Sequence, residues 1–258
     1  MGRALKTLSE AQRARVDLFE RGAKTPSSGN PHEIWFTCKR GDLAPALQSW
    51  RETLRSLPNT PLFFLQNGLG IAEELEPLGI AHWTRVACWW GARIEHQTLH
   101  LTPPPRQMCF AGEADPEFWR ACGFEVETLP QTARTTLEWR KALTNLTLNG
   151  LLTLHGLPNG ALLTKPDLLN QARELHLEAR SLAEALGETL MPLDRTWNEV
   201  LMTAQNTPKN RNSLLQDLEA KRPWELPWLN EWLLKKAAPL GLRLPHHHQL
   251  VQALHNLG

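Results

Sequence analysis

Short apolar runs alternate with helical patterns along the first 65 residues of the chain. A helix is expected at the start, where Ala4, Leu5 and Leu8 fall on one face. Strands are expected over 14–19, 33–38 and 61–65, with a loop over 22–32 and a helix over 43–57. Because strands alternate with helices, the pattern predicts a parallel sheet of the α/β class.

The pattern changes twice after this region. Residues 83–129 are rich in strand signals, with a strand pair over 83–104, strands over 107–112 and 124–129, and a short helix over 116–123. From Thr135 onward the strand signals stop, and helices are expected over 135–154, 166–187, 194–205, 213–219, 225–240 and 246–256. The chain therefore divides near residue 130 into an α/β domain, residues 1–130, and an all-α domain, residues 131–258.

One of these helices carries a polar stripe. Lys141, Asn145 and Asn149 recur every four residues in a segment that is otherwise mostly apolar. The simplest interpretation is a helix with one solvated face, since long polar side chains are mostly exposed. The alternative is a buried stripe kept for function, because a buried polar group without a partner costs a few kcal/mol.

Polar residues also follow two of the expected strands. Lys39 ends the strand 33–38, and Asn67 follows the strand 61–65. In parallel α/β sheets, ligands bind at the carboxyl ends of the strands. A solvated lysine and an ordinary Asn-Gly turn are the structural alternatives.

Three further features of the helical half have structural and functional interpretations. Ser213 is a good N-cap for the helix that follows it. Glu225 lies among Trp224, Leu226 and Trp228, so its carboxylate either reaches water or is held there for a purpose. The run 246–248 consists of three histidines, which point in different directions on a helix and cannot all bind one ion; a solvated helix start is expected there.

Composition narrows the class of protein. The chain has 258 residues, 41% of them hydrophobic and 21% charged, with a formal net charge of +1 and no long basic run, so no nucleic-acid partner is expected. It has no apolar run of membrane-spanning length and no signal peptide, so a cytoplasmic protein is expected. The four cysteines form no CxxC pair, and neither a disulfide framework nor a metal site is expected. The eleven tryptophans have no functional explanation beyond packing.

Five motifs together resemble the ketopantoate reductase (2-dehydropantoate 2-reductase) family over nearly the whole chain. They are FTCKRGD, LQNGLG, EWRKALTNLTLNG with its LPNG turn, NSLLQDLEAKRPWEL, and LGLRLP. The resemblance implies a Rossmann-like domain that binds NADP(H), incomplete at its start, followed by a helical domain for substrate binding and dimerisation. It implies reduction of ketopantoate to pantoate by NADPH, a step in pantothenate and coenzyme A biosynthesis, with a small 2-oxo acid as substrate and a homodimer as the assembly.

The resemblance also assigns roles to residues. Lys141 matches the general acid that protonates the 2-oxo oxygen, and Glu225 matches the acidic residue near the nicotinamide and substrate. The residues that match substrate-binding positions are Asn145, Asn149, Asn159, Asn210 and Ser213. The residues that match cofactor-binding positions are Gly2, Arg21, Lys39, Asn67 and Ala92, with Arg21 placed against the 2′-phosphate of NADPH.

The start of the chain departs from the family. Met1 and Gly2 match the last two residues of the phosphate-binding GxGxxG motif, and the first strand and the earlier glycines are absent. Either the sequence begins late, or the protein is a non-catalytic member that has lost cofactor binding. The retained polar residues favour the first explanation, because buried polar groups are costly without a role. A reductase of another 2-oxo acid is a third alternative.

Overall fold

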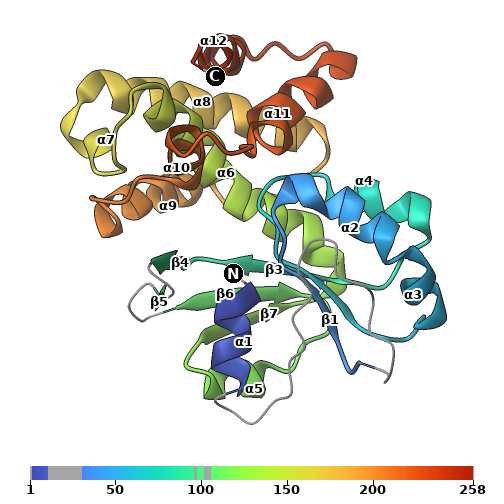
Figure 1. The fold of residues 1–258 in the computed structure, drawn as a ribbon. Helices are drawn as coiled ribbons and strands as arrows, with labels where there is room; N and C mark the ends of the chain where they lie inside the picture. The colour runs from blue at the N-terminus through green and yellow to red at the C-terminus, as the bar shows by residue number, and fades with distance from the viewer. Residues whose placement is uncertain (1, 11–30, 96–97, 102–105, 258) are drawn as a thin grey trace. The chain divides into compact units, whose positions relative to one another are not determined.

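The computed structural model describes residues 2–10, 31–95, 98–101 and 106–257. Two compact units emerge from the pattern of contacts. The first comprises Met1–Gln66 and Ile71–Leu137, and the second comprises Asn67–Gly70 and Glu138–Gly258. The predicted succession of an α/β half and an all-helical half is confirmed (Figure 1).

The first unit is built on a five-stranded mixed sheet with the order β1-β2-β3-β6-β7. The strands are β1 Ile34–Phe36, β2 Leu62–Phe64, β3 Thr84–Cys88, β6 Gln107–Ala111 and β7 Glu125–Leu129. The neighbours pair in parallel, except that β3 and β6 are antiparallel; the parallel pairing predicted for the first strands is confirmed, and the sheet as a whole is mixed. The reason is the connection between them, which holds a hairpin, β4 Ala92–Glu95 and β5 Thr98–Leu101, where a parallel neighbour would need a crossover.

Helices cover both faces of this sheet (Figure 1). They are α1 Gly2–Glu10, α2 Leu43–Ser49, α3 Arg51–Ser56, α4 Ile71–Leu75 and α5 Pro116–Ala121, with short 3-10 turns at Arg40–Asp42, Glu76–Leu78 and Gln131–Ala133. The single helix expected over 43–57 is two helices, because the backbone of Trp50 (φ −96°, ψ 1°) leaves the helical conformation between them. The expected strand over 14–19 lies outside the described residues.

Alternation along the strands sends side chains to two separate cores. In β2, Phe63 packs on one face with Leu5 of α1 and Trp119 of α5. On the opposite face, its neighbour Phe64 packs with a core that includes Leu43 of α2. This period of two is the pattern that marked the segment as a strand.

The second unit is helical and is organised around one long helix, α6 (Figure 1). Its helices are α6 Arg134–Leu154, α7 Ala161–Thr164, α8 Pro166–Ala185, α9 Leu193–Asn206, α10 Ser213–Glu219, α11 Asn230–Ala237 and α12 Pro245–His255. The last helical turns of α6 pack into one apolar core and its middle turns into another. The helix expected over 225–240 begins only at Asn230, because Leu226–Trp228 forms a 3-10 turn (η4).

The run of three histidines opens α12, and the prediction of a solvated helix start was wrong for His247. Its ring is fully buried, with Nε2 3.0 Å from the carbonyl oxygen of Leu175 and Nδ1 3.0 Å from the Asn230 amide nitrogen. The carboxylate of Glu178, in α8, accepts hydrogen bonds from the backbone N–H groups of His246 (2.9 Å) and His247 (3.0 Å). It caps the N-terminus of α12 in place of solvent.

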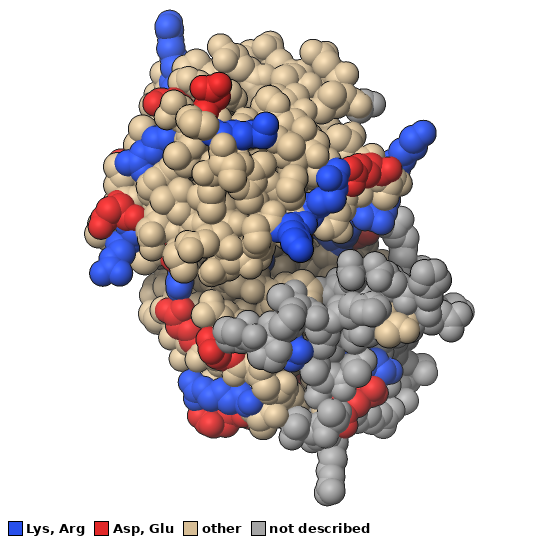
Figure 2. Space-filling view, turned by 90° about the vertical axis from the view of Figure 1, so that its left-hand side faces the viewer, with Lys and Arg blue, Asp and Glu red and all other residues tan. Residues whose placement is uncertain are grey.

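No helix among the described residues is long and apolar enough to cross a membrane. On the face in Figure 2, Lys and Arg side chains are interspersed with Asp and Glu. This mixing fits the formal net charge of +1.

Candidate functional site

The polar stripe lies on α6, where Lys141, Asn145 and Asn149 follow one another at successive turns. None of the residues 136–154 is exposed, and Asn149 is 8% exposed. No residue of the stripe is therefore fully solvated, and only Asn149 is buried. Lys141 and Asn145 are half-buried, so the stripe combines an ammonium group and two amides in a largely apolar setting.

The helix α10 is capped by Asn212, so the prediction that Ser213 is the N-cap was wrong by one residue. The Asn212 side chain accepts a hydrogen bond from the backbone N–H of Leu215 at 3.1 Å. Ser213 is the first residue of the helix and is exposed. Asparagine and serine cap helices about equally well, so local propensity could not decide between adjacent candidates. Helix capping therefore does not explain why a serine stands at position 213.

The turn with Asn159 is joined to the segment before α10. The Asn159 backbone N–H donates to the carbonyl oxygen of Asn210 at 2.9 Å, and its side-chain amide donates to Oγ1 of Thr207 at 2.8 Å. Gly160 lies so close to Pro208 that a Cβ atom would meet it at 2.8 Å. Asn159 is buried, whereas the side chain of Asn210 is exposed. The known contacts of Asn159 are thus made within the protein, and its predicted role toward substrate stays a prediction.

A second group of predicted residues meets at η4. Nδ2 of Asn67 donates to Oε2 of Glu225 at 3.3 Å, and both residues are half-buried. The next two residues lie against Trp228: the Leu69 N–H donates to its carbonyl oxygen at 3.0 Å, and Gly68, with φ +93°, leaves no room there for a Cβ atom. Only glycine suits this backbone at this distance. The Asn67–Gly70 segment thus holds the Asn67 amide on the Glu225 carboxylate.

Two buried polar side chains fix the end of β2, from which Asn67 follows. Gln66 is 3% exposed and donates to the carbonyl oxygen of Phe36 at 2.9 Å, at the end of the neighbouring β1. Arg85 in β3 is 2% exposed and donates to the carbonyl oxygen of Phe64 at 2.8 Å. The sequence gives no sign that Arg85 is buried, because a single charged residue within an expected strand does not reveal burial.

The other residues predicted to bind the cofactor can be placed in the fold, but the structure gives them no shared contact. Lys39 is exposed and lies three residues beyond Phe36, as Asn67 lies three residues beyond Phe64, its partner in the sheet register. Gly2 is the first residue of α1, and Ala92 is the first of β4. Arg21 lies outside the described residues.

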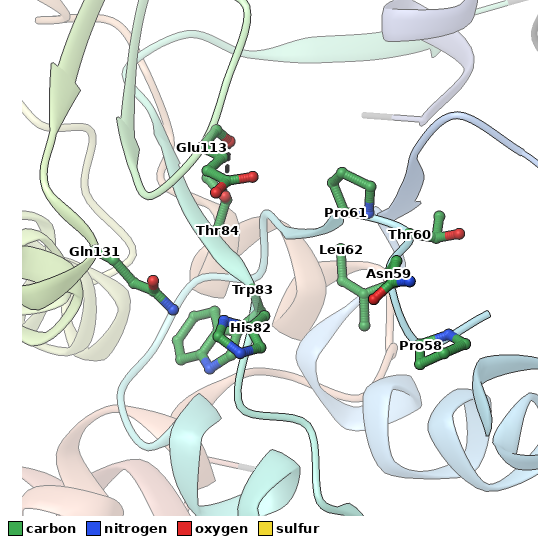
Figure 3. Close-up of a pocket in the computed structure, with 10 residues that line it drawn as sticks. All are labelled: Pro58, Asn59, Thr60, Pro61, Leu62, His82, Trp83, Thr84, Glu113 and Gln131. Carbon is green, nitrogen blue, oxygen red and sulfur yellow. Dashed lines mark hydrogen bonds between the residues drawn. The ribbon is translucent and has the colours of Figure 1, made fainter.

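A pocket of about 180 Å³ lies at the other end of the sheet, before β2 and β3 (Figure 3). Its walls include Trp83, His82 and Gln131, and Thr84 donates to the carbonyl oxygen of Glu113 at 2.8 Å beside it. None of the predicted site residues lines this pocket. It lies at the amino ends of the parallel strands, opposite the edge where such sheets bind ligands.

A buried polar network stiffens the helices around α6. His176 of α8 is fully buried, with its ring nitrogens 3.2 Å from Oγ1 of Thr147 and 3.0 Å from Oγ1 of Thr196. Because Thr147 donates its own hydroxyl proton to the carbonyl oxygen of Leu143, the imidazole donates to Thr147. Burial, aided by the charges of Arg180 and Arg173, lowers the pKa of His176 from 6.5 to about 4, so the ring is neutral at pH 7.

The helical unit offers an ammonium group and several amide and hydroxyl donors, which suit an anionic ligand rich in oxygen atoms. The carboxylate of Glu225, joined to the amide of Asn67, can accept from and donate to the hydroxyl or amide groups of a ligand. Among the described residues no group of three or more His, Cys, Asp or Glu side chains is arranged to hold a metal ion.

Comparisons with known proteins agree with this fit. Residues 135–258 match the family described as "Ketopantoate reductase PanE/ApbA C terminal". The chain is 29% identical over 230 residues to 2-dehydropantoate 2-reductase from Escherichia coli O157:H7, covering 85% of this chain and 72% of the relative.

Two solved structures share the fold. The ternary structure of D-mandelate dehydrogenase with NADH and anilino(oxo)acetate has a TM-score of 0.76 at 18% identity, covering 88% of this chain and 76% of that one. The dimeric ketopantoate reductase from Staphylococcus aureus has a TM-score of 0.69 at 18% identity, covering 88% and 79%. The predicted fold class, a Rossmann-like domain followed by a helical domain, is confirmed.

Proposed function

The chain is related to the ketopantoate reductase family along 85% of its length, and from this premise we propose that it reduces ketopantoate to pantoate with NADPH. The observation that carries the proposal is the stripe of Lys141, Asn145 and Asn149 on α6, where no residue from 136 to 154 is exposed. Polar groups in such a setting are costly to keep without a role, and an ammonium followed by two amides on one helix face suits a small 2-oxo acid. The product would serve pantothenate and coenzyme A biosynthesis.

In this proposal Lys141 is the general acid. Reduction of a ketone places negative charge on the carbonyl oxygen as hydride reaches the carbon. An ammonium hydrogen-bonded to that oxygen stabilises the charge and then transfers its proton, which gives the alcohol. The half-buried setting of Lys141 strengthens this interaction, because the local dielectric constant is lower than that of water.

The substrate would be oriented by the other groups on the same scaffold. Asn145 and Asn149 lie one and two turns beyond Lys141, where their amides can hydrogen-bond the 2-oxo and hydroxyl groups. Ser213, at the first turn of α10, would donate to the substrate carboxylate, aided by the backbone near Asn210. Holding the 2-oxo group in one orientation gives much of the rate enhancement.

NADPH would supply the hydride. Asn67 and Glu225 would hold its nicotinamide riboside, and Lys39, with Arg21, would face its phosphates. Gly2, at the first residue of α1, and Ala92 would provide close backbone approach.

The experiment is a steady-state assay of NADPH oxidation with ketopantoate. Lys141→Ala should lower kcat by about 10²–10⁴-fold, the usual contribution of a general acid. The matched control is Lys165→Ala, which removes an exposed ammonium of the same helical unit and should leave kcat unchanged. Equal turnover in the two variants would refute the role of Lys141.

Two experimental outcomes would favour a different function for the chain. Faster turnover of another 2-oxo acid in a substrate panel would show a reductase of different specificity. Calorimetry that detects no NADPH binding would favour the non-catalytic alternative. The homodimer is proposed from the family, one member of which is described as dimeric, and light scattering during gel filtration tests it.

A further inference from the structure

Asn212 differs from its neighbours in the segment before α10. Asn210, Arg211 and Ser213 are exposed, whereas Asn212 is 4% exposed. A buried carboxamide needs several partners, because each polar atom removed from water without one costs free energy. The contacts of Asn212 therefore show what its side chain holds in place.

The side chain joins two helices. Its Oδ1 accepts from the backbone N–H of Leu215 in α10 at 3.1 Å and from Oγ1 of Thr153 in α6 at 3.2 Å. Its Nδ2 donates to the carbonyl oxygen of Asn149 in α6 at 3.3 Å. One amide thus caps α10 and ties it to the turn of α6 that carries the last residue of the polar stripe.

Capping alone does not require this residue. Serine would cap α10 about as well as asparagine, but its hydroxyl is too short to accept from Leu215 and reach Asn149 and Thr153 as well. The longer amide supplies the second connection. Ser213 follows Asn212 directly, so its backbone position relative to α6 is set by this connection.

We propose that Asn212 is a positioning residue, which holds Ser213 at a fixed distance from Asn149 and thereby tunes the affinity for the 2-oxo acid carboxylate. The inference rests on the proposed function, in which Ser213 and Asn149 bind substrate. Asn212 acts through Ser213 and touches neither the substrate nor the cofactor.

The test is a double-mutant cycle that combines Asn212→Ser with Ser213→Ala. Asn212→Ser keeps the cap and removes the link to α6. In the otherwise unchanged chain it should raise KM for ketopantoate by about tenfold, with less change in kcat and none in KM for NADPH. In the Ser213→Ala background the same substitution should change KM by less than about twofold, because the residue it positions is gone.

The control is Asn256→Ser, an exposed position at the end of α12, which should leave KM unchanged. Thr153→Val removes one partner of the amide without touching the cap, and it should raise KM by about threefold; it serves as the test if Asn212→Ser does not fold.

The outcomes separate this inference from the proposed function. An unchanged KM, or an equal rise with and without Ser213, in a protein that turns over ketopantoate overturns the positioning role alone. A wild-type chain without turnover overturns the proposed function, and the positioning role with it. If the effects of Asn212→Ser and Ser213→Ala are non-additive and confined to the KM for ketopantoate, the positioning role of Asn212 is supported.

Discussion

Replacing Gly68 with alanine tests whether the Asn67–Gly70 segment sets the geometry of Glu225. Gly68 has φ +93°, and an added Cβ atom would lie 2.7 Å from the carbonyl oxygen and 2.9 Å from the Cβ atom of Trp228. Neither is the end of a flexible side chain, so the segment or η4 must move.

The cost has two separable parts. An L-residue with positive φ costs about 1–3 kcal/mol wherever it occurs. The steric contact costs a further 1–3 kcal/mol or so if the surroundings yield only in part. If the segment moves away, the hydrogen bond from Leu69 to Trp228 is lost, at about 1 kcal/mol. These two responses are alternatives, so crowding against Trp228 costs about 1–3 kcal/mol beyond backbone strain.

Gly187→Ala isolates the strain. Gly187 has φ +82°, close to that of Gly68, and nothing lies within 4 Å of a Cβ atom placed there. Chemical denaturation should show that Gly68→Ala lowers the free energy of unfolding by about 1–3 kcal/mol more than Gly187→Ala. In the assay of NADPH oxidation, Gly68→Ala should lower kcat/KM by about 10²-fold, since an ångström of displacement separates Asn67 from Glu225. Gly187→Ala should keep kcat/KM unchanged. Equal stability and equal kcat/KM in the two variants would refute the reasoning.

Two further predictions concern the helical unit. The pKa of His176 is about 4 in the folded chain against 6.5 ordinarily, so the folded chain holds the ring neutral where the unfolded chain would protonate it. The free energy of unfolding should therefore be highest above pH 6.5 and fall by up to about 3 kcal/mol as the pH drops toward 4. Denaturation at pH 7 and pH 4.5 should show this loss, and His176→Gln should reduce it; the same pH dependence in that variant would contradict it. Glu178→Gln removes the charge that caps α12 and should destabilise the chain by about 1–2 kcal/mol, whereas Glu174→Gln, at an exposed position of α8, should not.

The sequence predicted best where one local pattern was sufficient. The α10 range was correct to the residue, and α6 differed by one residue, because apolar periodicity and helix-forming residues agreed there. The break at Trp50 was missed because helix-forming residues flank it on both sides, in Leu43–Ser49 and Arg51–Ser56. Trp50 is half-buried against the core that includes Leu43, a tertiary contact that has no local sequence signal. The direction of β6 depends on a hairpin that the strand signals alone could not orient.

The sequence indicated the polar residues of the candidate site, but not the residues that hold them in position. Lys141, Asn145 and Asn149 were recognisable from their spacing of four residues. The partners that fix them come from distant parts of the chain: Asn212 bonds Asn149 across 63 residues, and Asn67 bonds Glu225 across 158. Such pairs leave no local signature, since each residue alone resembles an ordinary turn or cap.

The long separation between Asn67 and Glu225 also constrains how the protein is made. During synthesis the Asn67–Gly70 segment leaves the ribosome well before η4 exists, so β2 ends in a turn that has no partner until most of the chain is complete. At 5–20 residues per second, translating the intervening 158 residues takes roughly 8–30 s. In a fragment that ends near residue 130, the Asn67–Gly70 segment would lack Glu225 and Trp228, the residues it contacts. Each of the two units thus combines two separate stretches of the chain, and the second needs Asn67–Gly70 from within the first half of the sequence.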